Sequence, residues 1–381
     1  MKHRLLQWLE CPTCSSVFTA EAFVSESDGI LEGALHCRCQ TVVPIVGGIP
    51  RFLKDWPQQF PEFATRYRGR FDEDLDRASG AENWFQRWQE RTRKSFGYQW
   101  TVFGRMVCDF RMNFLNYVHP LTSGDFAGRL GLDVGCGFGR HIFNAAGLGA
   151  EMVGVDLSRA IDVAARNTKE LAGVHLIQAD LYRLPLRPGT FDLVYSLGVL
   201  HHLPDPQGGF EAIVQQAKPN GHVAVWLYST SRRFTNIALE AARFVARRLP
   251  LPVLKGLAYL AAAIDWGGFI LPYKCASRLP GLGRIVDRLT LSRVKIYSAY
   301  PFQVAAADWF DRLSAPIRYY YRREDVERWF REAGLTRIQV SPTGLYGWRG
   351  CGQRPVPHAN AVPGQPTAQQ SSVESTGLPV S

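Results

Sequence analysis

The stretch LDVGCGFGR, from Leu132 to Arg140, decides the fold of this 381-residue chain. An apolar run over 130–134 leads into three alternating glycines, and a helical pattern then covers 141–147. Glycine tolerates positive φ angles and lets backbone N–H groups approach a ligand with no Cβ in between. The pattern therefore predicts a strand, a tight ligand-binding turn and a helix.

A second apolar run, VGVDLS from Val153 to Ser158, predicts the next strand of an α/β unit. It ends at Asp156, about 20 residues after the glycines, where a carboxylate can accept hydrogen bonds from a ribose diol. The glycines follow the spacing G-x-G-x-G and not the G-x-G-x-x-G of dinucleotide sites. These features predict a pocket for a nucleoside cofactor that is not a dinucleotide.

The stretch from Leu132 to Arg140 resembles the first motif of class I S-adenosylmethionine-dependent methyltransferases. Further segments match that family in the same order along the chain: IQADL at 177–181, FDLVYS at 191–196, LGVLHHLPDP at 197–206 and KPNGH at 218–222. The last of these leads into an expected strand at 223–228. The resemblance implies an α/β fold with a Rossmann-like seven-stranded sheet, mostly parallel, in which the last strand is antiparallel. It also implies S_N2 methyl transfer from S-adenosylmethionine.

The same resemblance implies which residues bind the cofactor. Asp133, Gly135, Gly137 and Gly139 fall on the methionine and ribose side, Asp156 and Leu157 on the ribose, Asp180 and Leu181 on the adenine, and Ser196 on the fourth strand. For Asp133 the alternative is a strand residue that caps the turn. The family's acceptors differ widely, so the resemblance names the methyl donor and not the acceptor.

His201 and His202 follow the fourth strand, at the carboxyl edge where ligands of open α/β sheets bind. An imidazole has a suitable pKa for a general base, which a hydroxyl acceptor needs. The alternative is that the two histidines only shape the pocket. Both are candidate catalytic residues.

Two cysteine pairs lie near the start of the chain, Cys11 with Cys14 and Cys37 with Cys39. Four thiolates can close a tetrahedral structural zinc site. The segment over 43–52 also resembles the end of the zinc-ribbon activator partners of some methyltransferases. The alternative is a small β module without metal.

The formal charge of +10 is concentrated between Ser231 and Tyr300, where twelve Lys or Arg face three acids. Three interpretations are open: basic helices that lie on an anionic membrane, a surface for phosphate-bearing substrates or RNA, and a helical cap over the active site. An apolar run covers 256–264, but Pro250, Pro252, Lys255 and Asp265 are expected to keep it too short to span a membrane.

The stretch DWFDRLSAPIRYYY, from Asp308 to Tyr321, mixes aromatic and charged residues and resembles a segment before the last helix of related methyltransferases. Asp311, Arg318 and Tyr319 are therefore candidate acceptor-binding residues, against the alternative that they only pack. Aromatic residues over 95–100 could cover the methionine end of the cofactor, although packing of helix on sheet is the favoured interpretation.

The apolar fraction of 46% and the charged fraction of 20% exclude a disordered chain. No charged-then-apolar leader opens the sequence, so a cytoplasmic protein, with peripheral membrane contact as an option, is expected. The expected division is a zinc-ribbon-like module (1–55), a helical connector (56–127), a cofactor-binding core (128–230), a basic helical insertion (231–321), a closing helix and strands (322–352) and a disordered tail (353–381).

The function predicted from all of this is methyl transfer from S-adenosylmethionine to a small-molecule, glycan or lipid-linked acceptor, with structural zinc in the first module. One alternative is an RNA-directed methyltransferase, although no basic groove with stacking aromatics is evident outside the insertion. Another is a non-catalytic cofactor-binding or scaffold protein.

Overall fold

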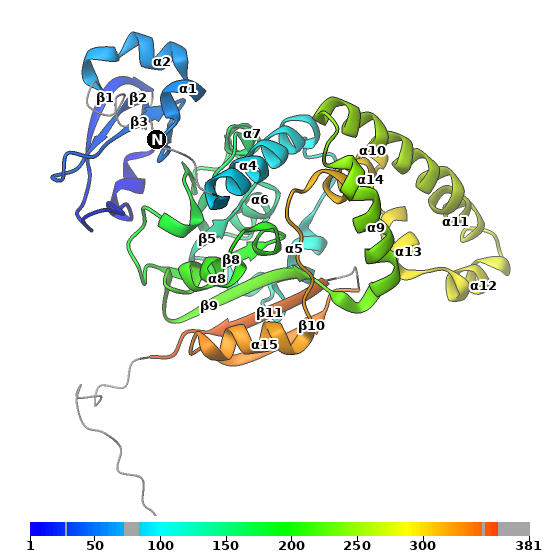
Figure 1. Ribbon diagram of the computed structural model, residues 1–381. Coiled ribbons are helices and arrows are strands. Elements are labelled where there is room, and N and C mark those ends of the chain that lie inside the picture. The colour runs from blue at the N-terminus through cyan, green and yellow to red at the C-terminus, as the bar shows by residue number, and fades with distance from the viewer. Residues whose placement is uncertain (27–28, 72–83, 345–346, 357–381) are drawn as a thin grey trace, which may run out of the picture.

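The computed structural model describes residues 1–26, 29–71, 84–344 and 347–356, and its centre is a seven-stranded sheet (Figure 1). The strand order is β10-β11-β9-β8-β5-β6-β7. Strands β5 to β9 are parallel, and β11 is antiparallel to both β9 and β10. This confirms the predicted fold class. The strands are β5 (Leu130–Val134), β6 (Glu151–Asp156), β7 (Val174–Gln178), β8 (Phe191–Leu197), β9 (Ala217–Tyr228), β10 (Thr336–Pro342) and β11 (Gly347–Gln353).

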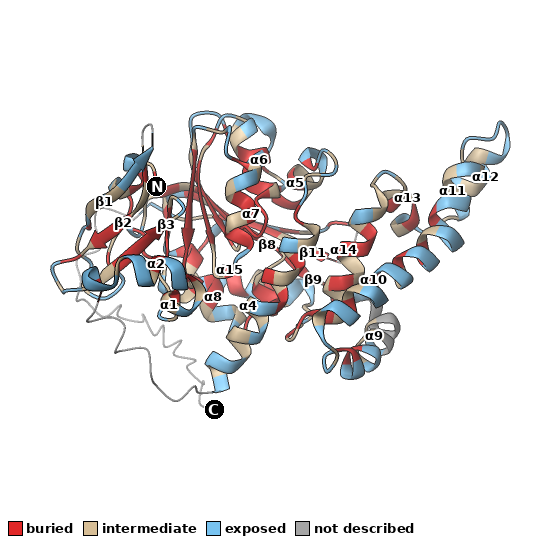
Figure 2. Cartoon of the chain, turned by 90° about the horizontal axis from the view of Figure 1, so that it is seen from above, coloured by how far each residue is buried: buried red, intermediate tan, exposed pale blue. Residues whose placement is uncertain are grey.

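Helices cover both faces of the sheet, because successive strand residues point to opposite sides. Leu132 and Val134 face one apolar core with α8 and α15, while Met152 and Tyr195 face a second core with α5, α6 and α7. The strands between these layers are largely buried in Figure 2. These helices are α5 (Arg111–Val118), α6 (Arg140–Gly147), α7 (Ala160–Asn167), α8 (Pro206–Val214) and α15 (Arg323–Glu332).

The first residues form a separate four-stranded antiparallel sheet in the order β1-β2-β3-β4, preceded by a short 3-10 helix, η1 (His3–Gln7). Its strands are β1 (Thr19–Glu26), β2 (Gly29–His36), β3 (Val42–Val46) and β4 (Ile49–Pro50). The small sheet packs against the β7 edge of the large one. The buried Arg51 binds Gln178 of β7 at 2.9 Å and Asp162 of α7 at 2.6 Å, so the two sheets are joined by polar contacts as well as by a shared core.

The connector between the two sheets is helical over the residues that are described there. It comprises α1 (Trp56–Gln59), α2 (Pro61–Arg66), α4 (Trp84–Phe103) and α5. Residues 72–83 lie outside the described residues. The long helix α4 contacts α7 and α14, so it crosses the carboxyl edge of the sheet where a ligand is expected.

The predicted insertion is also helical and lies to the right in Figure 1. Its helix α14 packs against α10, α9 and α4 and thereby attaches the insertion to the core. The helices are α9 (Arg233–Ala246), α10 (Leu251–Asp265), the π-helical turn η8 (Trp266–Ile270), α11 (Leu271–Ala276), α12 (Leu282–Leu289), α13 (Ser292–Ser298) and α14 (Phe302–Ser314).

The expectation that the apolar run in the insertion is too short to span a membrane is wrong as regards length. Leu251 to Ala276 form one continuous helix of 26 residues, long and apolar enough by length and composition. Pro252 lies in the first turn, where no N–H is needed. Asp265 is buried but forms an ion pair with Arg293, so it does not break the helix.

At the other end of the chain, β11 continues to Gln353 and Arg354 donates hydrogen bonds to the carbonyls of Gln215 and Ala217. The core thus extends slightly into the predicted tail. From residue 357 onward the predicted disordered tail lies outside the described residues.

Candidate active site

A cavity of about 540 Å³ lies at the carboxyl edge of the large sheet, beneath α4 and α14. This volume is in the range of small-molecule and cofactor sites. The glycine turn after β5, the end of β6 and the loop after β7 line one end. Residues from β9, α13, α14 and the segment after α14 line the other. We call these the donor end and the acceptor end.

The glycine turn is shaped for close contact at the donor end. Gly135, Gly137 and Gly139 all have positive φ angles, of 80°, 54° and 87°. A Cβ on Gly135 would lie 2.4 Å from a methyl carbon of Val199, and one on Gly137 would lie 3.2 Å from Nε1 of Trp100. Side chains at these positions would therefore strain the turn and occupy space beside the cavity. Gly135 and Gly137 line the cavity, whereas Gly139 does not.

Asp156 ends β6 and lies against the glycine turn. Its Oδ2 accepts a hydrogen bond from the Gly137 N–H at 2.9 Å, and its Oδ1 accepts from the N–H and the hydroxyl of Ser158 at 2.8 and 2.7 Å. Burial raises the pKa of Asp156, and these hydrogen bonds partly oppose that shift. The carboxylate is thus held in one orientation at the cavity wall, next to Leu157.

Asp180 follows β7 and caps the 3-10 turn η5 (Leu181–Arg183). Its Oδ1 accepts from the Tyr182 N–H at 3.0 Å, and its Oδ2 accepts from Gln89 of α4 at 2.7 Å. Asp180 and Leu181 both line the cavity. The predicted ribose and adenine acids therefore lie at the same cavity, on neighbouring strands.

Besides Gly139, two further predicted cofactor residues do not line the cavity. Asp133 is only 1% exposed within β5 and does not line the cavity, and burial followed by the nearby Asp156 raises its pKa well above the ordinary value. Ser196 is fully buried in β8, and its hydroxyl donates to the Val134 carbonyl at 2.8 Å. Ser196 thereby links β8 to β5, whereas Oδ2 of Asp133 is buried with no hydrogen-bond partner among the described residues.

The structure separates the two candidate histidines, which lie in the 3-10 turn η6 (Leu200–His202). His202 lines the cavity, and its Nδ1 bonds the Ile317 carbonyl at 2.8 Å, so Nε2 carries the lone pair. Burial lowers the pKa of His202 to about 4, so the ring is neutral at physiological pH. His201 is fully buried behind it, against the ring of Tyr228, and does not line the cavity.

The acceptor end contains a cluster of polar side chains around Asp311 of α14. Its Oδ2 accepts a hydrogen bond from the Tyr228 hydroxyl at 2.6 Å, and its Oδ1 lies 3.7 Å from Nε2 of His202. Burial acts to raise the pKa of Asp311, but the neighbouring His202 and Arg318 and the Tyr228 hydrogen bond outweigh it, so the pKa lies below its ordinary value.

Arg318 lies over the face of Tyr228, with its guanidinium carbon 4.1 Å from the ring centroid. Its Nε and Nη1 are buried, and within the described part of the chain neither has a hydrogen-bond partner. A buried guanidinium with free donors can bind an anionic or strongly polar group. The third predicted acceptor residue, Tyr319, is 41% exposed and does not line the cavity, whereas its neighbour Tyr320 does.

Several cavity residues were not among the predicted site residues. On α4 these include Phe96, Gln99 and Trp100, from the stretch for which packing was the favoured interpretation. Phe96 lies against His202 with ring centroids 4.9 Å apart. Tyr228 was also missed, although its position at the carboxyl end of a parallel strand is a signal that the sequence carries.

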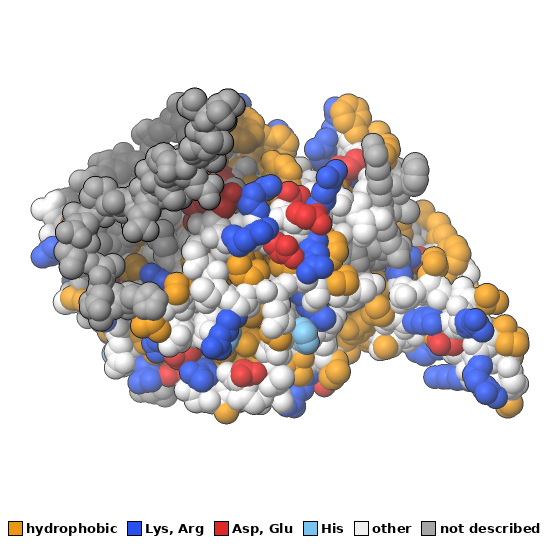
Figure 3. Space-filling view, turned by 90° about the horizontal axis from the view of Figure 1, so that it is seen from below, with side chains coloured by type: hydrophobic (Ala, Val, Ile, Leu, Met, Phe, Trp, Pro, Cys, Tyr) orange, Lys and Arg blue, Asp and Glu red, His pale blue; other side chains and the backbone are white. Residues whose placement is uncertain are grey.

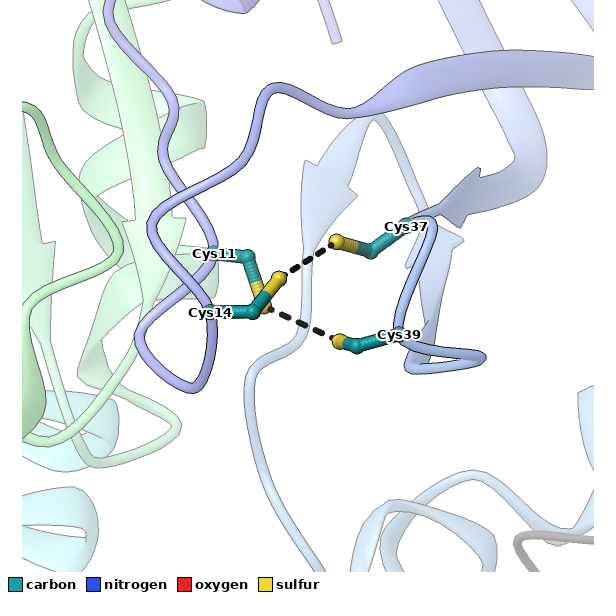
Figure 4. Close-up of side chains that lie close together, drawn as sticks. All are labelled: Cys11, Cys14, Cys37 and Cys39. Carbon is teal, nitrogen blue, oxygen red and sulfur yellow. Dashed lines mark hydrogen bonds between the residues drawn. The ribbon is translucent and has the colours of Figure 1, made fainter.

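The four predicted zinc ligands come together in the small N-terminal sheet (Figure 4). The sulfur atoms of Cys11, Cys14, Cys37 and Cys39 all lie within 4.8 Å of one another. The Cys11–Cys39 and Cys14–Cys37 sulfur distances are 3.6 and 3.3 Å. Tetrahedral zinc with Zn–S bonds of about 2.3 Å places sulfurs about 3.8 Å apart, so the donor set fits a zinc ion after small adjustments.

Comparisons with known proteins agree with this site. The family description "Methyltransferase domain" matches residues 132–225, which include the glycine turn, Asp156, Asp180 and both histidines. The ubiquinone biosynthesis O-methyltransferase of Burkholderia ambifaria is 34% identical over 159 residues, which cover 41% of this chain and 64% of that protein. The corresponding protein of Marinobacter nauticus is 32% identical over 182 residues, covering 46% of this chain and 71% of that protein.

The chain therefore belongs to the S-adenosylmethionine-dependent methyltransferases. Within them it is a class I member, as its sequence matches and seven-stranded sheet show. Among solved structures, a complex of the Haloferax volcanii Trm112 methyltransferase activator with a putative methyltransferase is 13% identical, with a TM-score of 0.41, and the match covers 70% of this chain and 99% of that one.

Proposed function

We propose that this chain transfers a methyl group from S-adenosylmethionine to an oxygen atom of a small-molecule acceptor. The observation that carries the proposal is the single cavity, which has Asp156 and Asp180 at one end and His202, with a free Nε2, at the other. The two matched relatives are O-methyltransferases by name. When bound, the cofactor supplies an electrophilic methyl group on a positively charged sulfur.

The donor end fits S-adenosylmethionine. Gly135 and Gly137 leave space at the wall that a Cβ would fill, and Asp156 and Asp180 retain lone pairs for hydroxyl and amino donors. In our proposal Asp156 binds the ribose hydroxyls, with Leu157 beside it, and Asp180 and Leu181 contact the adenine. Gly139, Asp133 and Ser196 hold the turn and the strands in place.

At the acceptor end, we assign proton removal to His202 and not to His201. The neutral ring offers Nε2 to a hydroxyl, and the proton it takes would then be stabilised by Asp311, 3.7 Å away. The hydroxyl oxygen would displace the sulfur of the methyl donor, so that the O–H and sulfur–methyl bonds break as the oxygen–methyl bond forms, the proton goes to Nε2 of His202 and S-adenosylhomocysteine leaves as the neutral thioether. Arg318 has free donors to hold a negative or polar group of the acceptor, and aromatic residues of α4 would contact its apolar part.

The test is labelled-methyl transfer to cell extract divided into small-molecule, lipid and RNA fractions. We expect label in the small-molecule or lipid fraction, and a fall in kcat of about 100-fold or more in the His202→Gln variant. The matched control is His222→Gln, a half-buried histidine of β9 outside the cavity. Label confined to RNA, or full activity in His202→Gln, would contradict the proposal.

We also propose that Cys11, Cys14, Cys37 and Cys39 bind one structural zinc ion. The four sulfurs fit a tetrahedral site and leave no coordination position for a substrate. Metal analysis of protein purified without chelators should find about one zinc per chain, and a Cys37→Ser, Cys39→Ser variant should lose it. Metal-free protein with unchanged thermal stability would refute a structural zinc.

The remaining expectations stay proposals. The domain boundaries at 55, 127, 230 and 321, and a cytoplasmic or membrane-peripheral location, are among them. The alternative of RNA as acceptor has the positive charge of the insertion in its favour. The alternative of a non-catalytic cofactor-binding protein would be supported by cofactor binding with no transfer to any fraction.

A further inference from the structure

The outer face of the insertion has an unusual composition. One side of α10, with Leu254, Ala258, Ala262 and Asp265, is buried against the protein. From 252 to 272, every exposed residue is uncharged, and each is either apolar or a glycine. Its large members are Val253, Leu257, Tyr259, Leu260, Ile264, Phe269 and Leu271, of which Leu260 and Ile264 are 58% and 63% exposed.

The next helix, α12, repeats this composition. Leu282, Ile285 and Leu289 recur at helical spacing and are exposed, and Leu289 is 79% exposed. Figure 2 shows α11 and α12 extending away from the rest of the molecule, largely exposed. We call α10, η8, α11 and α12 the arm. Monomeric soluble proteins rarely expose contiguous apolar surface on this scale without a binding role.

Positive charge accompanies the apolar side chains. Arg278, Arg284 and Arg288 are exposed on the arm, and over 271–300 the sequence has six Lys or Arg against one acid, Asp287. Figure 3 shows Lys and Arg side chains next to hydrophobic ones on the arm, at the right of the view. A partner with negative charge at its surface and an apolar interior would complement this surface.

We propose that the arm docks onto the surface of an anionic phospholipid bilayer. Apolar helix faces bordered by Lys and Arg bind such surfaces by burying the apolar face and attracting anionic headgroups. The two properties occur together on the arm, and a bilayer satisfies both.

The arm lies on the bilayer and does not cross it. Only 28% of the most apolar 18-residue stretch of the Leu251–Ala276 helix is buried. The buried residues of this helix attach it to the rest of the protein. Asp265 binds Arg293 of α13 at 2.9 Å and accepts from Trp309 of α14 at 3.2 Å. A spanning helix would have to leave these partners, whereas surface docking keeps them.

Docking would also place the acceptor end near lipid. Leu291 follows α12 directly, is 66% exposed and lines the cavity, so it marks a point where the cavity meets the surface. Arg293 and Tyr297, further along α13, line the cavity as well. Resting on the proposed function, we infer that the acceptor is an amphiphile with its apolar chain in the bilayer and its hydroxyl near His202.

The test is sedimentation of the full chain with vesicles. Wild-type protein should pellet with vesicles of equal parts phosphatidylglycerol and phosphatidylcholine, and much less with phosphatidylcholine alone or at high salt. A Leu260→Ser, Ile264→Ser variant should bind about tenfold more weakly. The matched control is Val17→Ser, Met112→Ser, which removes two exposed apolar side chains outside the arm.

Wild-type protein that stays in the supernatant, or an arm variant that pellets like wild type, would overturn the proposal. A second contrary result would come from the molar mass in solution. If wild-type protein is a dimer that does not bind vesicles and the arm variant is a monomer, the arm contacts a second copy of the chain. Retention of single-stranded RNA, lost in Arg284→Ser, Arg288→Ser, without vesicle binding would also overturn it. Calorimetric titration with S-adenosylhomocysteine keeps the two proposals apart, since it reports the donor end alone.

Discussion

The donor and acceptor ends of the cavity differ in how their polar groups are satisfied. At the donor end, both carboxylate oxygens of Asp156 and of Asp180 accept hydrogen bonds within the protein. At the acceptor end, Oδ1 of Asp311 and two nitrogens of Arg318 have no hydrogen-bond partner among the described residues. Buried polar groups without partners are costly. This difference indicates that the two acids of the donor end are held in place by the protein, whereas Asp311 and Arg318 keep polar atoms available to a ligand.

The two ends also differ in their origin along the chain. The donor end comes from three consecutive strand ends between Gly135 and Leu181, while the acceptor end joins η6, β9, α13, α14 and the segment after α14. Helix α4 borders both ends, since Gln89 bonds Asp180 and Phe96 lies against His202. Changes at one end should therefore leave ligand affinity at the other end largely intact.

The largest effect is expected for Gly135→Val. A valine at this position would have to adopt a positive φ angle, and its side chain would overlap Val199. The glycine turn would therefore be displaced. We expect cofactor affinity to fall by more than about 100-fold by calorimetry, in line with a strained and overpacked position. Gly256→Ala, where no atom lies within 4 Å of the added Cβ, is the matched control and should bind normally.

Asp156→Ala should have the next largest effect. Loss of hydrogen bonds to a charged group should weaken cofactor binding by about 1.5 to 3 kcal/mol, and Asp156→Asn, which keeps one acceptor oxygen, should lie between the two. Calorimetry with S-adenosylhomocysteine measures this directly. Unchanged affinity in Asp156→Ala would remove this residue from the donor end.

His202 should make stability depend on pH. Its pKa is lowered from 6.5 to about 4 in the folded chain, so between these values only the unfolded chain takes up the proton. Stability is therefore fully present above pH 6.5 and is lost as the pH falls toward 4, by about 2 kcal/mol at pH 5 from this residue. Urea unfolding at pH 7 and pH 5 measures the free energy of unfolding at each pH. Its decrease from pH 7 to pH 5 should be smaller in His202→Gln than in wild-type protein. Equal losses in both proteins would argue against a buried neutral imidazole.

The smallest effect is expected for Arg318→Met, which removes the free donors but keeps most of the volume. We expect kcat/KM for the acceptor to fall about tenfold, or about 1.4 kcal/mol, with cofactor affinity unchanged. A matched change is Arg322→Met, an exposed arginine before α15. If cofactor affinity fell instead, the division into two ends would be wrong.

Most residues that the sequence assigned to the donor end line the cavity there, because they lie in short local motifs. The G-x-G-x-G turn and the acids after β6 and β7 occupy strand ends, and parallel strands bring those ends to one edge. Inside the strands the prediction was less accurate. Asp133 and Ser196 lie within β5 and β8, where neighbouring residues alternate between faces, and both support the core.

The acceptor end was harder to predict because orientation there depends on distant packing. His201 and His202 are adjacent, yet only the second lines the cavity, since η6 turns the first against Tyr228. In the irregular segment after α14, Tyr320 lines the cavity and Tyr319 does not. Sequence periodicity does not predict which histidine or which tyrosine of each pair lines the cavity. The continuous helix from Leu251 to Ala276 was missed because Pro252 lies in its first turn and Asp265 is buried in an ion pair with Arg293, and neither arrangement can be read from the sequence.

The most direct test of the account is a crystal structure of the chain with S-adenosylhomocysteine. We predict that the ribose hydroxyls bind Asp156, that the adenine lies beside Asp180, and that the sulfur points along the cavity toward His202 and Arg318. A ligand bound outside this cavity, or with its adenine at the His202 end, would contradict the assignment of the donor and acceptor ends.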